Sequence, residues 1–277
     1  MHDLAGNFYM VDDMVYSKDS SIFSPAASSA VVYEVIRIID GTPLFFNDHF
    51  ERMEKSFLML GTHLNILKED LDAKISKLIN INSNKNCNVK VMVSNNDVKQ
   101  VCLVYISKSY YPVQKEIESG VKVDFFSTER SDPNIKKINL SYKEQLDNFI
   151  KENNLFEALL VNRHDEITEG SKSNVFFARG NSIITAPDEV VLQGITRKYI
   201  LDVCSDLNLS IIKKKVHIDD LLSMDGLFLS GTSIKVLPVS HVGKLTFNSA
   251  QLPVINNIRR NFDLVIERDL SHKRDNR

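Results

Sequence analysis

The chain has 277 residues, enough for one large domain or two modest ones. Hydrophobic residues make up 43% and charged residues 25% of it, and 34 basic against 36 acidic residues give a formal charge of -2. This balance argues against a dominant nucleic-acid surface, and no apolar run approaches the length that crosses a membrane. The first residues lack the basic region and apolar run of a secretory signal, so we expect a cytoplasmic protein.

The first hundred residues predict antiparallel strands and two amphipathic helices. The strands are rich in β-branched side chains, and the first helix carries apolar residues at spacings of three and four. Asn47 or Asp48 is expected to cap that first helix. In chain order the predicted elements are a strand at 31–39, a partner strand beginning at 44–46, the capped helix, a helix at 66–80, and strands at 88–94 and 100–107.

The second half mixes strands with four helices, which predicts an α+β arrangement and not a regular βαβ alternation. Expected strands cover 121–126, 157–162, 173–178, 182–185 and 226–230, and expected helices cover 142–155, 196–207, 218–223 and 250–268. The best linker candidate lies at 111–120. It separates an N-terminal domain at 1–110 from a C-terminal domain at 121–277.

Two adjacent lysines are candidates for covalent chemistry. Lys136 and Lys137 are flanked by isoleucines, so one of them is expected to point inward. Burial lowers the pKa of a lysine and makes its amine a nucleophile that can form a Schiff base with a carbonyl. Periodicity does not decide which of the two points in, and most such pairs are simply solvated.

Three other segments are ambiguous when each is taken alone. Glu169 is expected in a turn between strands, either solvated or holding a cationic ring nitrogen. The segment 194–197, Gly-Ile-Thr-Arg, opens a predicted helix, whose first N–H groups suit a phosphate; the plain alternative is that Thr196 only caps it. The segment 230–233, Ser-Gly-Thr-Ser, suits either close approach of a ligand or an ordinary turn.

The three cysteines, Cys87, Cys102 and Cys204, are too far apart for a Cys-x-x-Cys motif and are expected to be reduced core residues. The histidines show no metal-binding spacing. The sequence therefore predicts no structural metal.

Taken together and in this order, these segments resemble the fold-type IV pyridoxal-phosphate enzymes: branched-chain aminotransferase, D-amino acid aminotransferase and aminodeoxychorismate lyase. The resemblance runs from about Val31 to Val242. Its most specific blocks are Ile-Thr-Glu-Gly-Ser-x-Ser-Asn-Val-Phe at 167–176 and Leu-x-Gly-Ile-Thr-Arg at 192–197. It implies a smaller N-terminal α/β domain and a larger C-terminal domain that binds pyridoxal 5'-phosphate, in a homodimer with sites between the domains near the subunit interface.

The resemblance also implies roles for matching residues. Lys136 would be the Schiff-base lysine, whose freed amine moves a proton between the substrate Cα and the cofactor C4′. Glu169 would keep the pyridine nitrogen protonated, which makes the ring an electron sink. The phosphate would be held by Arg52, the N–H groups of Ile195 and Thr196, and the hydroxyl of Thr232. Tyr33, Arg37 and Ser233 would lie on the substrate side.

The chain departs from the family where substrate is recognised. Residues 24–30 replace a glycine-rich family stretch. Asn95 stands where D-amino acid aminotransferase and the lyase carry an arginine that contacts the substrate carboxylate. Leu140 stands where the branched-chain enzymes carry a tyrosine that touches the phenolic oxygen of the cofactor.

Three hypotheses follow from the resemblance. The first is an aminotransferase that moves an amino group between an amino acid and a 2-oxo acid, of unassigned stereochemistry. The second is aminodeoxychorismate lyase, which forms 4-aminobenzoate and pyruvate with the same lysine. The third is a homologue that binds the cofactor without turnover.

Overall fold

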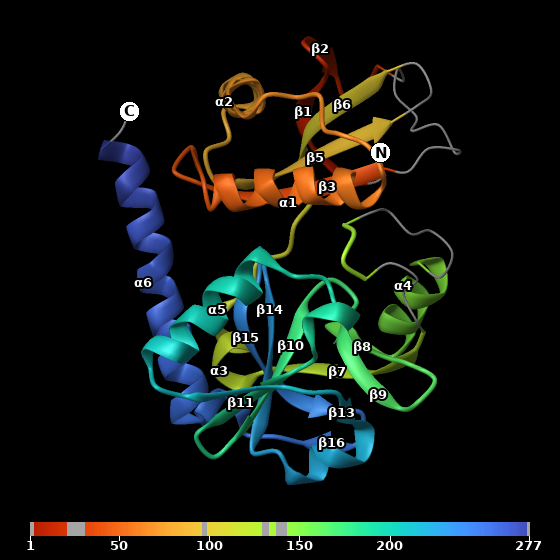
Figure 1. The fold of residues 1–277 in the computed structure, drawn as a ribbon, viewed down its shortest axis with the longest axis vertical. Helices are drawn as coiled ribbons and strands as arrows, with labels where there is room; N and C mark the ends of the chain where they lie inside the picture. The colour runs from red at the N-terminus through yellow and green to blue at the C-terminus, as the bar shows by residue number, and fades with distance from the viewer. Residues whose placement is uncertain (1–2, 21–30, 96–98, 129–132, 137–142, 276–277) are drawn as a thin grey trace. The chain divides into compact units, whose positions relative to one another are not determined.

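The computed structural model describes residues 3–20, 31–95, 99–128, 133–136 and 143–275. Backbone contacts divide the chain into two compact units, and each unit contains one sheet. The long C-terminal helix α6 (Pro253–Asp275), blue in Figure 1, contributes residues to both. The first unit consists of Met1–Tyr110, Ile135–Ile138 and Arg268–Arg277, and the second of Tyr111–Asn134 and Asn139–Glu267.

The first unit contains an antiparallel sheet in the order β2-β1-β6-β5-β3-β4, with two helices (Figure 1). Its described elements are β1 (Leu4–Val11), β2 (Met14–Ser17), β3 (Val31–Ile39), β4 (Thr42–Pro43), α1 (Phe46–Met59), α2 (Lys68–Asn82), β5 (Cys87–Asn95) and β6 (Gln100–Ser107). One face of the sheet packs with α1 and α2 in an apolar core that includes Val32, Ile36, Met53 and Phe57. Side chains alternate between the two faces of a sheet along a strand, so residue 34 of β3 lies on the same core face as Val32 and Ile36.

Two details at the start of α1 correct the sequence predictions. The partner strand expected from 44–46 is absent from the described residues, because β4 covers only Thr42–Pro43 and the helix begins at Phe46. Neither Asn47 nor Asp48 caps the helix. The capping position is Phe45, which has a left-handed backbone (φ 50°) and donates its N–H to Asp269 Oδ2 at 2.9 Å. The strands β1 and β2 were not predicted.

The second unit is built on a larger mixed sheet in the order β12-β11-β10-β14-β15-β7-β8-β9-β13, with β16 paired to β15. Its described strands are β7 (Val121–Ser127), β8 (Glu157–Val161), β9 (Glu166–Gly170), β10 (Asn174–Arg179), β11 (Ser182–Thr185), β12 (Ser210–Lys213), β13 (Val216–His217), β14 (Gly226–Gly231), β15 (Lys235–Val242) and β16 (Leu245–Thr246). Its α-helices are α3 (Gln114–Ser119), α4 (Lys143–Glu152), α5 (Ile195–Asp206) and most of α6. The mixed α+β class predicted from the sequence is confirmed.

Several boundaries in this unit differ from the predictions. Glu169 was expected in a turn but lies in β9, which pairs with β8. The expected helix at 218–223 is a 3-10 helix, Ile218–Ser223, and the helix expected from 250 begins at Pro253. Part of the predicted linker forms α3. The strands β9, β12, β13, β15 and β16 were not predicted.

The cysteines confirm their prediction as core residues, because Cys87, Cys102 and Cys204 are all free and buried. Burial raises the pKa of the Cys87 thiol to about 11 and that of the Cys204 thiol to about 12, so both stay protonated at neutral pH. None of the helices in the described part of the chain is long and apolar enough to span a bilayer.

Candidate active site

Lys136 belongs to the first unit and lies beside β3. Its carbonyl accepts a hydrogen bond of 2.9 Å from the N–H of Tyr33, so its backbone is fixed against that strand. Its half-buried side chain places Nζ 4.8 Å from the centroid of the Tyr33 ring. An ammonium group at this distance is attracted by the negative face of the ring. Lys137, Asn139 and Leu140 lie outside the described residues, as does the stretch 24–30.

A buried carboxylate holds Arg52 on the other face of β3. Glu34 is fully buried among the apolar core residues of that strand. Arg52 donates Nε to Glu34 Oε1 at 2.8 Å and Nη2 to Oε2 at 2.5 Å, which makes a two-pronged pair. His49, one helical turn before Arg52 on α1, lies with Nδ1 2.7 Å from Glu34 Oε2.

The charges in this cluster are mutually consistent. Burial alone would raise the pKa of Glu34, but the Arg52 guanidinium and the hydrogen bonds from His49 and Arg52 lower it to about 2. Burial lowers the pKa of His49, and the positive charges of Arg52 and Lys136 act in the same direction, against the opposing effect of Glu34. His49 is therefore neutral and donates Nδ1–H to an ionised Glu34, which leaves Arg52 as the cation of the pair.

In the second unit, Glu169 holds the loop that leads into α5. The carboxylate is 3% exposed, and its Oε2 accepts the N–H of Leu192 at 3.1 Å. Asn174, at the start of β10, donates Nδ2 to the carbonyl of Leu192 at 2.9 Å. The same carbonyl accepts the N–H of Gly194 at 2.8 Å. Two buried polar side chains thus fix the backbone immediately before the helix.

The helix α5 begins at Ile195, with Gly194 at the capping position and no side-chain cap. Thr196 lies within the first turn, so the alternative that it only caps the helix is wrong. The first N–H groups of a helix lack acceptors within it and carry partial positive charge. A Cβ at Gly194 would lie 2.4 Å from Asn174 Oδ1, so a larger residue here would displace the Asn174 side chain from its hydrogen bond to Leu192.

The end of β14 lies next to Asn174, because Ser230 is its cross-strand partner. Paired residues project from the same face of a sheet, so the Ser230 hydroxyl lies on the face that carries Asn174 and the α5 loop. The Ser230 Oγ is buried and lacks a hydrogen-bond partner among the described residues. Thr232 and Ser233 follow in the turn between β14 and β15.

A second buried carboxylate fixes the turn that follows Glu169. Glu157, at the start of β8, accepts the N–H of Lys172 at 2.6 Å and the hydroxyls of Ser173 and Ser171 at 3.0 and 3.3 Å. Burial raises the pKa of Glu157, and these hydrogen bonds oppose that effect. A Cβ at Gly170 would lie 2.6 Å from Glu157 Oε1, so a larger residue here would disturb these hydrogen bonds.

Arg197 binds the segment that precedes α5. Its Nη1 lies 2.7 Å from Asp188 Oδ1 and its Nη2 donates to the carbonyl of Ala186 at 2.8 Å. Burial alone would raise the pKa of Asp188, but Lys213 and Arg197 lower it. The arginine of the Gly-Ile-Thr-Arg block therefore ties the first turn of α5 to the segment before it.

The structure arranges the predicted residues in two groups. In the first unit, Lys136 lies against the ring of Tyr33. Arg52 is hydrogen-bonded to Glu34. Arg37 lies two residues beyond Val35, on the face of β3 that carries Tyr33. In the second unit, Glu169 is joined through the Leu192–Gly194 loop to Ile195 and Thr196, and Thr232 follows Ser230.

Sequence reasoning assigned no role to Glu34, His49, Asn174 or Glu157. Glu34 had a usable signal, since it is a carboxylate in a row of alternating apolar residues on β3. A charge on a core face requires a partner, which an arginine on the following helix can supply. The hydrogen bonds of Asn174 and Glu157 depend on contacts that only the folded chain reveals.

Comparison with known proteins gives both sequence and fold relatives. The model of the amino-transferase class IV family matches residues 31–242. A D-alanine aminotransferase of Bacillus licheniformis is 31% identical over 242 residues, which is 82% of this chain and 84% of that protein. A D-alanine aminotransferase of Staphylococcus epidermidis is 28% identical over 254 residues, 85% of this chain and 88% of that protein.

Solved structures of low sequence identity share the fold. The branched-chain amino acid aminotransferase of Escherichia coli superposes with a TM-score of 0.82 at 17% identity, covering 95% of each chain. The T.th. branched-chain enzyme with pyridoxamine 5'-phosphate gives 0.80 at 18% identity, covering 94% of this chain and 93% of that one.

Proposed function

The chain belongs to the class IV aminotransferase family, and we propose that it uses pyridoxal 5'-phosphate to move an amino group between a D-amino acid and a 2-oxo acid. The observation that carries this proposal is the placement of Lys136, whose backbone is bound to β3 and whose amine lies against the Tyr33 ring. The preference for D-amino acids is supported by the D-alanine aminotransferases that share 31% and 28% identity with the chain.

The residues of the second unit fit a cofactor with a phosphate and a pyridine ring. Glu169 is a buried carboxylate that can accept a ring N–H and hold it protonated. The start of α5 offers the N–H groups of Ile195 and Thr196 to an anion. The buried Ser230 hydroxyl beside them lacks a partner within the described residues. The cofactor-binding role of the domain at 121–277 rests on this fit.

Each residue of the proposed cofactor site has a separate role. When bound, the cofactor supplies an aldehyde that condenses with amines and a ring that takes up electrons. Lys136 would hold the cofactor covalently, and its freed amine would move a proton to and from the substrate Cα. Arg52, oriented by Glu34, is one candidate phosphate ligand. The Thr232 hydroxyl and the first N–H groups of α5 are the other candidates, and each would donate to the phosphate.

Gly194→Ala tests the phosphate role of the α5 start. The added Cβ would meet Asn174 Oδ1, and relief of such overpacking costs about 1–3 kcal/mol. We expect the dissociation constant of pyridoxal 5'-phosphate, measured by titration of apoprotein, to rise about tenfold or more. Gly226→Ala is the matched control, since a Cβ at Gly226 would lie 2.5 Å from Leu252 Cδ1 and would cause similar overpacking away from the start of α5. Equal cofactor affinity in both variants would contradict the assignment.

The function is tested by an amino-donor screen on protein reconstituted with pyridoxal 5'-phosphate. D-alanine and 2-oxoglutarate should give pyruvate and glutamate, with L-alanine and branched-chain amino acids as the matched arms. Turnover of the L-isomer alone would refute the stereochemical part. Pyruvate release from aminodeoxychorismate without an amino acceptor, with no transamination, would favour the lyase and refute the proposal.

We also propose a homodimer, which is supported by the resemblance to the family. Light scattering of the purified holoenzyme measures its mass directly. A mass of about twice the 31.5 kDa of the chain is expected, and a monomer at working concentration would refute it.

A further inference from the structure

The face of the small sheet opposite α1 and α2 combines tyrosines and a lysine. Lys90 in the middle of β5 is paired with Val35 on β3 and with Tyr105 on β6, while Tyr33 is paired with Met92. Paired residues and residues two apart along a strand project from one face, so the side chains of these residues share a surface. This surface includes the ring against which the Lys136 amine lies.

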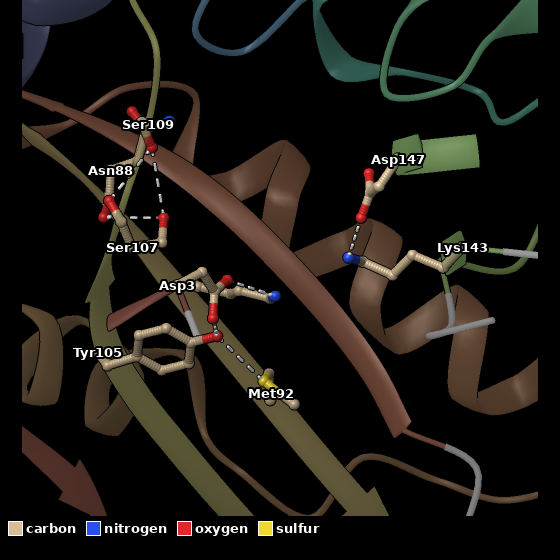
Figure 2. Close-up of polar contacts among 9 residues, drawn as sticks. Asp3, Asn88, Met92, Tyr105, Ser107, Ser109, Lys143 and Asp147 are labelled. Atoms are coloured by element: carbon tan, nitrogen blue, oxygen red, sulfur yellow. Dashed lines mark hydrogen bonds and ion pairs between the residues drawn. The ribbon is translucent and has the colours of Figure 1, made fainter. Parts of the chain in front are cut away.

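Lys90 is held there by an anion and by aromatic rings. Its Nζ lies 3.0 Å from Asp3 Oδ2, 5.1 Å from the centroid of the Tyr33 ring and 5.8 Å from that of Tyr105. Figure 2 shows the Tyr105 hydroxyl directed at Asp3, to which it donates at 2.8 Å. The Lys90 side chain remains 17% exposed and Asp3 is 42% exposed, so the pair is reachable from outside.

Tyr33 therefore lies beside two ammonium groups with different surroundings. Lys136 is the amine that the proposed reaction uses, and Lys90 is a second cation beside the same ring. Every amino acid and 2-oxo acid carries a carboxylate, which needs a cation or a set of donors when it leaves water. An ammonium group can donate three hydrogen bonds, so its pair with Asp3 is compatible with a second anionic partner.

We propose that Lys90 binds a carboxylate of the amino acid and 2-oxo acid substrates, which makes it a specificity-determining residue for the transamination proposed above. The inference rests on that proposed function. Arg37 lies on the same face of β3 but is farther from Tyr33 along the strand. Arg37 is paired with Asn88, whereas Lys90 is paired with Val35, which is two residues closer to Tyr33.

The test uses Lys90→Met and Lys90→Arg holoenzymes and two acids that cannot react, propionate and glutarate. Calorimetry gives their dissociation constants, and steady-state assays give KM and kcat for the amino donor and acceptor. Loss of one charge-assisted hydrogen bond should raise the dissociation constant about 10- to 100-fold in Lys90→Met, with KM rising more than kcat falls. Lys90→Arg should recover most of the affinity, because it restores the charge.

Lys74→Met is the matched control. Lys74 is also paired with an aspartate, Asp13, and its side chain is 13% exposed, but it lies on α2 at the other face of the sheet. Its dissociation constants should equal those of the wild type. Lys90→Gln serves as a second variant if methionine lowers thermal stability.

The outcomes separate the two proposals. Weaker binding of both acids in Lys90→Met assigns the residue to the α-carboxylate, and weaker binding of glutarate alone assigns it to a distal carboxylate; both support the inference. If the variant binds both acids as tightly as the wild type does and the enzyme transaminates, the inference is overturned and the proposed function stands. The inference is also overturned if a wild type that transaminates binds neither acid. Lys90-dependent binding without any transamination refutes the function and keeps the anion site.

Discussion

Replacing Lys136 by alanine is expected to slow the half-reaction with an amino donor by about 10³-fold or more, because in the proposed function this one amine both holds the cofactor and moves the proton. The fold should survive. The contact of Lys136 with β3 is made by its carbonyl, which alanine keeps, and its side chain is only half-buried. Single-turnover absorbance measurements on reconstituted protein report the half-reaction directly.

Two lysine variants control this measurement. Lys143→Ala removes an exposed lysine on α4 whose Nζ lies 2.7 Å from Asp147, the pair visible in Figure 2, and should keep wild-type rates. Lys137→Ala tests the alternative that the sequence left open. A Lys136→Ala protein that reacts within tenfold of wild type, or a Lys137→Ala protein that is inactive, would contradict the assignment.

Glu34→Ala should produce the largest loss of stability. The change leaves Arg52 and His49 without the buried carboxylate that they share. Removing one partner of a buried ion pair costs about 3–5 kcal/mol, because the remaining charge stays desolvated. In a chain of this size each kcal/mol corresponds to roughly 2–4 °C, so thermal unfolding should shift by about 10 °C or more. Glu34→Gln keeps the shape and should lose less.

The pH dependence of stability provides an independent check on Glu34. The pKa of its carboxyl is about 2 in the folded protein against an ordinary 4.5, so its contribution is fully present above pH 4.5 and is lost as the pH falls toward 2. The full contribution is about 3 kcal/mol. Urea unfolding of wild type and Glu34→Gln between pH 6 and 3 should show curves that converge as the pH falls. If the difference in the free energy of unfolding between the two proteins stayed constant over this pH range, it would contradict the conclusion that Arg52 keeps the Glu34 carboxylate ionised.

The same variant connects the fold to the proposed chemistry. Glu34 restrains the guanidinium of Arg52 through two hydrogen bonds, so Glu34→Gln should loosen the proposed phosphate ligand without removing it. We expect weaker binding of pyridoxal 5'-phosphate in Glu34→Gln than in wild type at a temperature where both are folded. Arg52→Ala should weaken binding further.

The strands of the first sheet were predictable because they carry their own signals. The β-branched runs at 31–39, 88–94 and 100–107 correspond to β3, β5 and β6 within one residue at each end. Their side chains alternate between a core face and a second face, and this pattern is a local property of the sequence. The family blocks then identified Lys136, Glu169 and the α5 start as candidates.

Other features depend on contacts between distant parts of the chain. The start of α1 was misplaced because the backbone of Phe45 is held by Asp269, which lies far along the sequence. Glu169 was placed in a turn because its polar neighbours conceal a strand that pairs with β8. The position of Lys90 beside Tyr33 requires the register of β3 on β5, which no local pattern contains.

The most direct test of the account is to reduce the reconstituted holoenzyme with borohydride and map the modified peptide by mass spectrometry. Reduction fixes the cofactor on the amine that carries it, so the label reports the reactive lysine without any assay of turnover. We predict a single pyridoxyl group on Lys136, and none after reduction of the Lys136→Ala protein. A label on Lys137 or on another lysine, or protein that takes up no cofactor, would contradict the central claim.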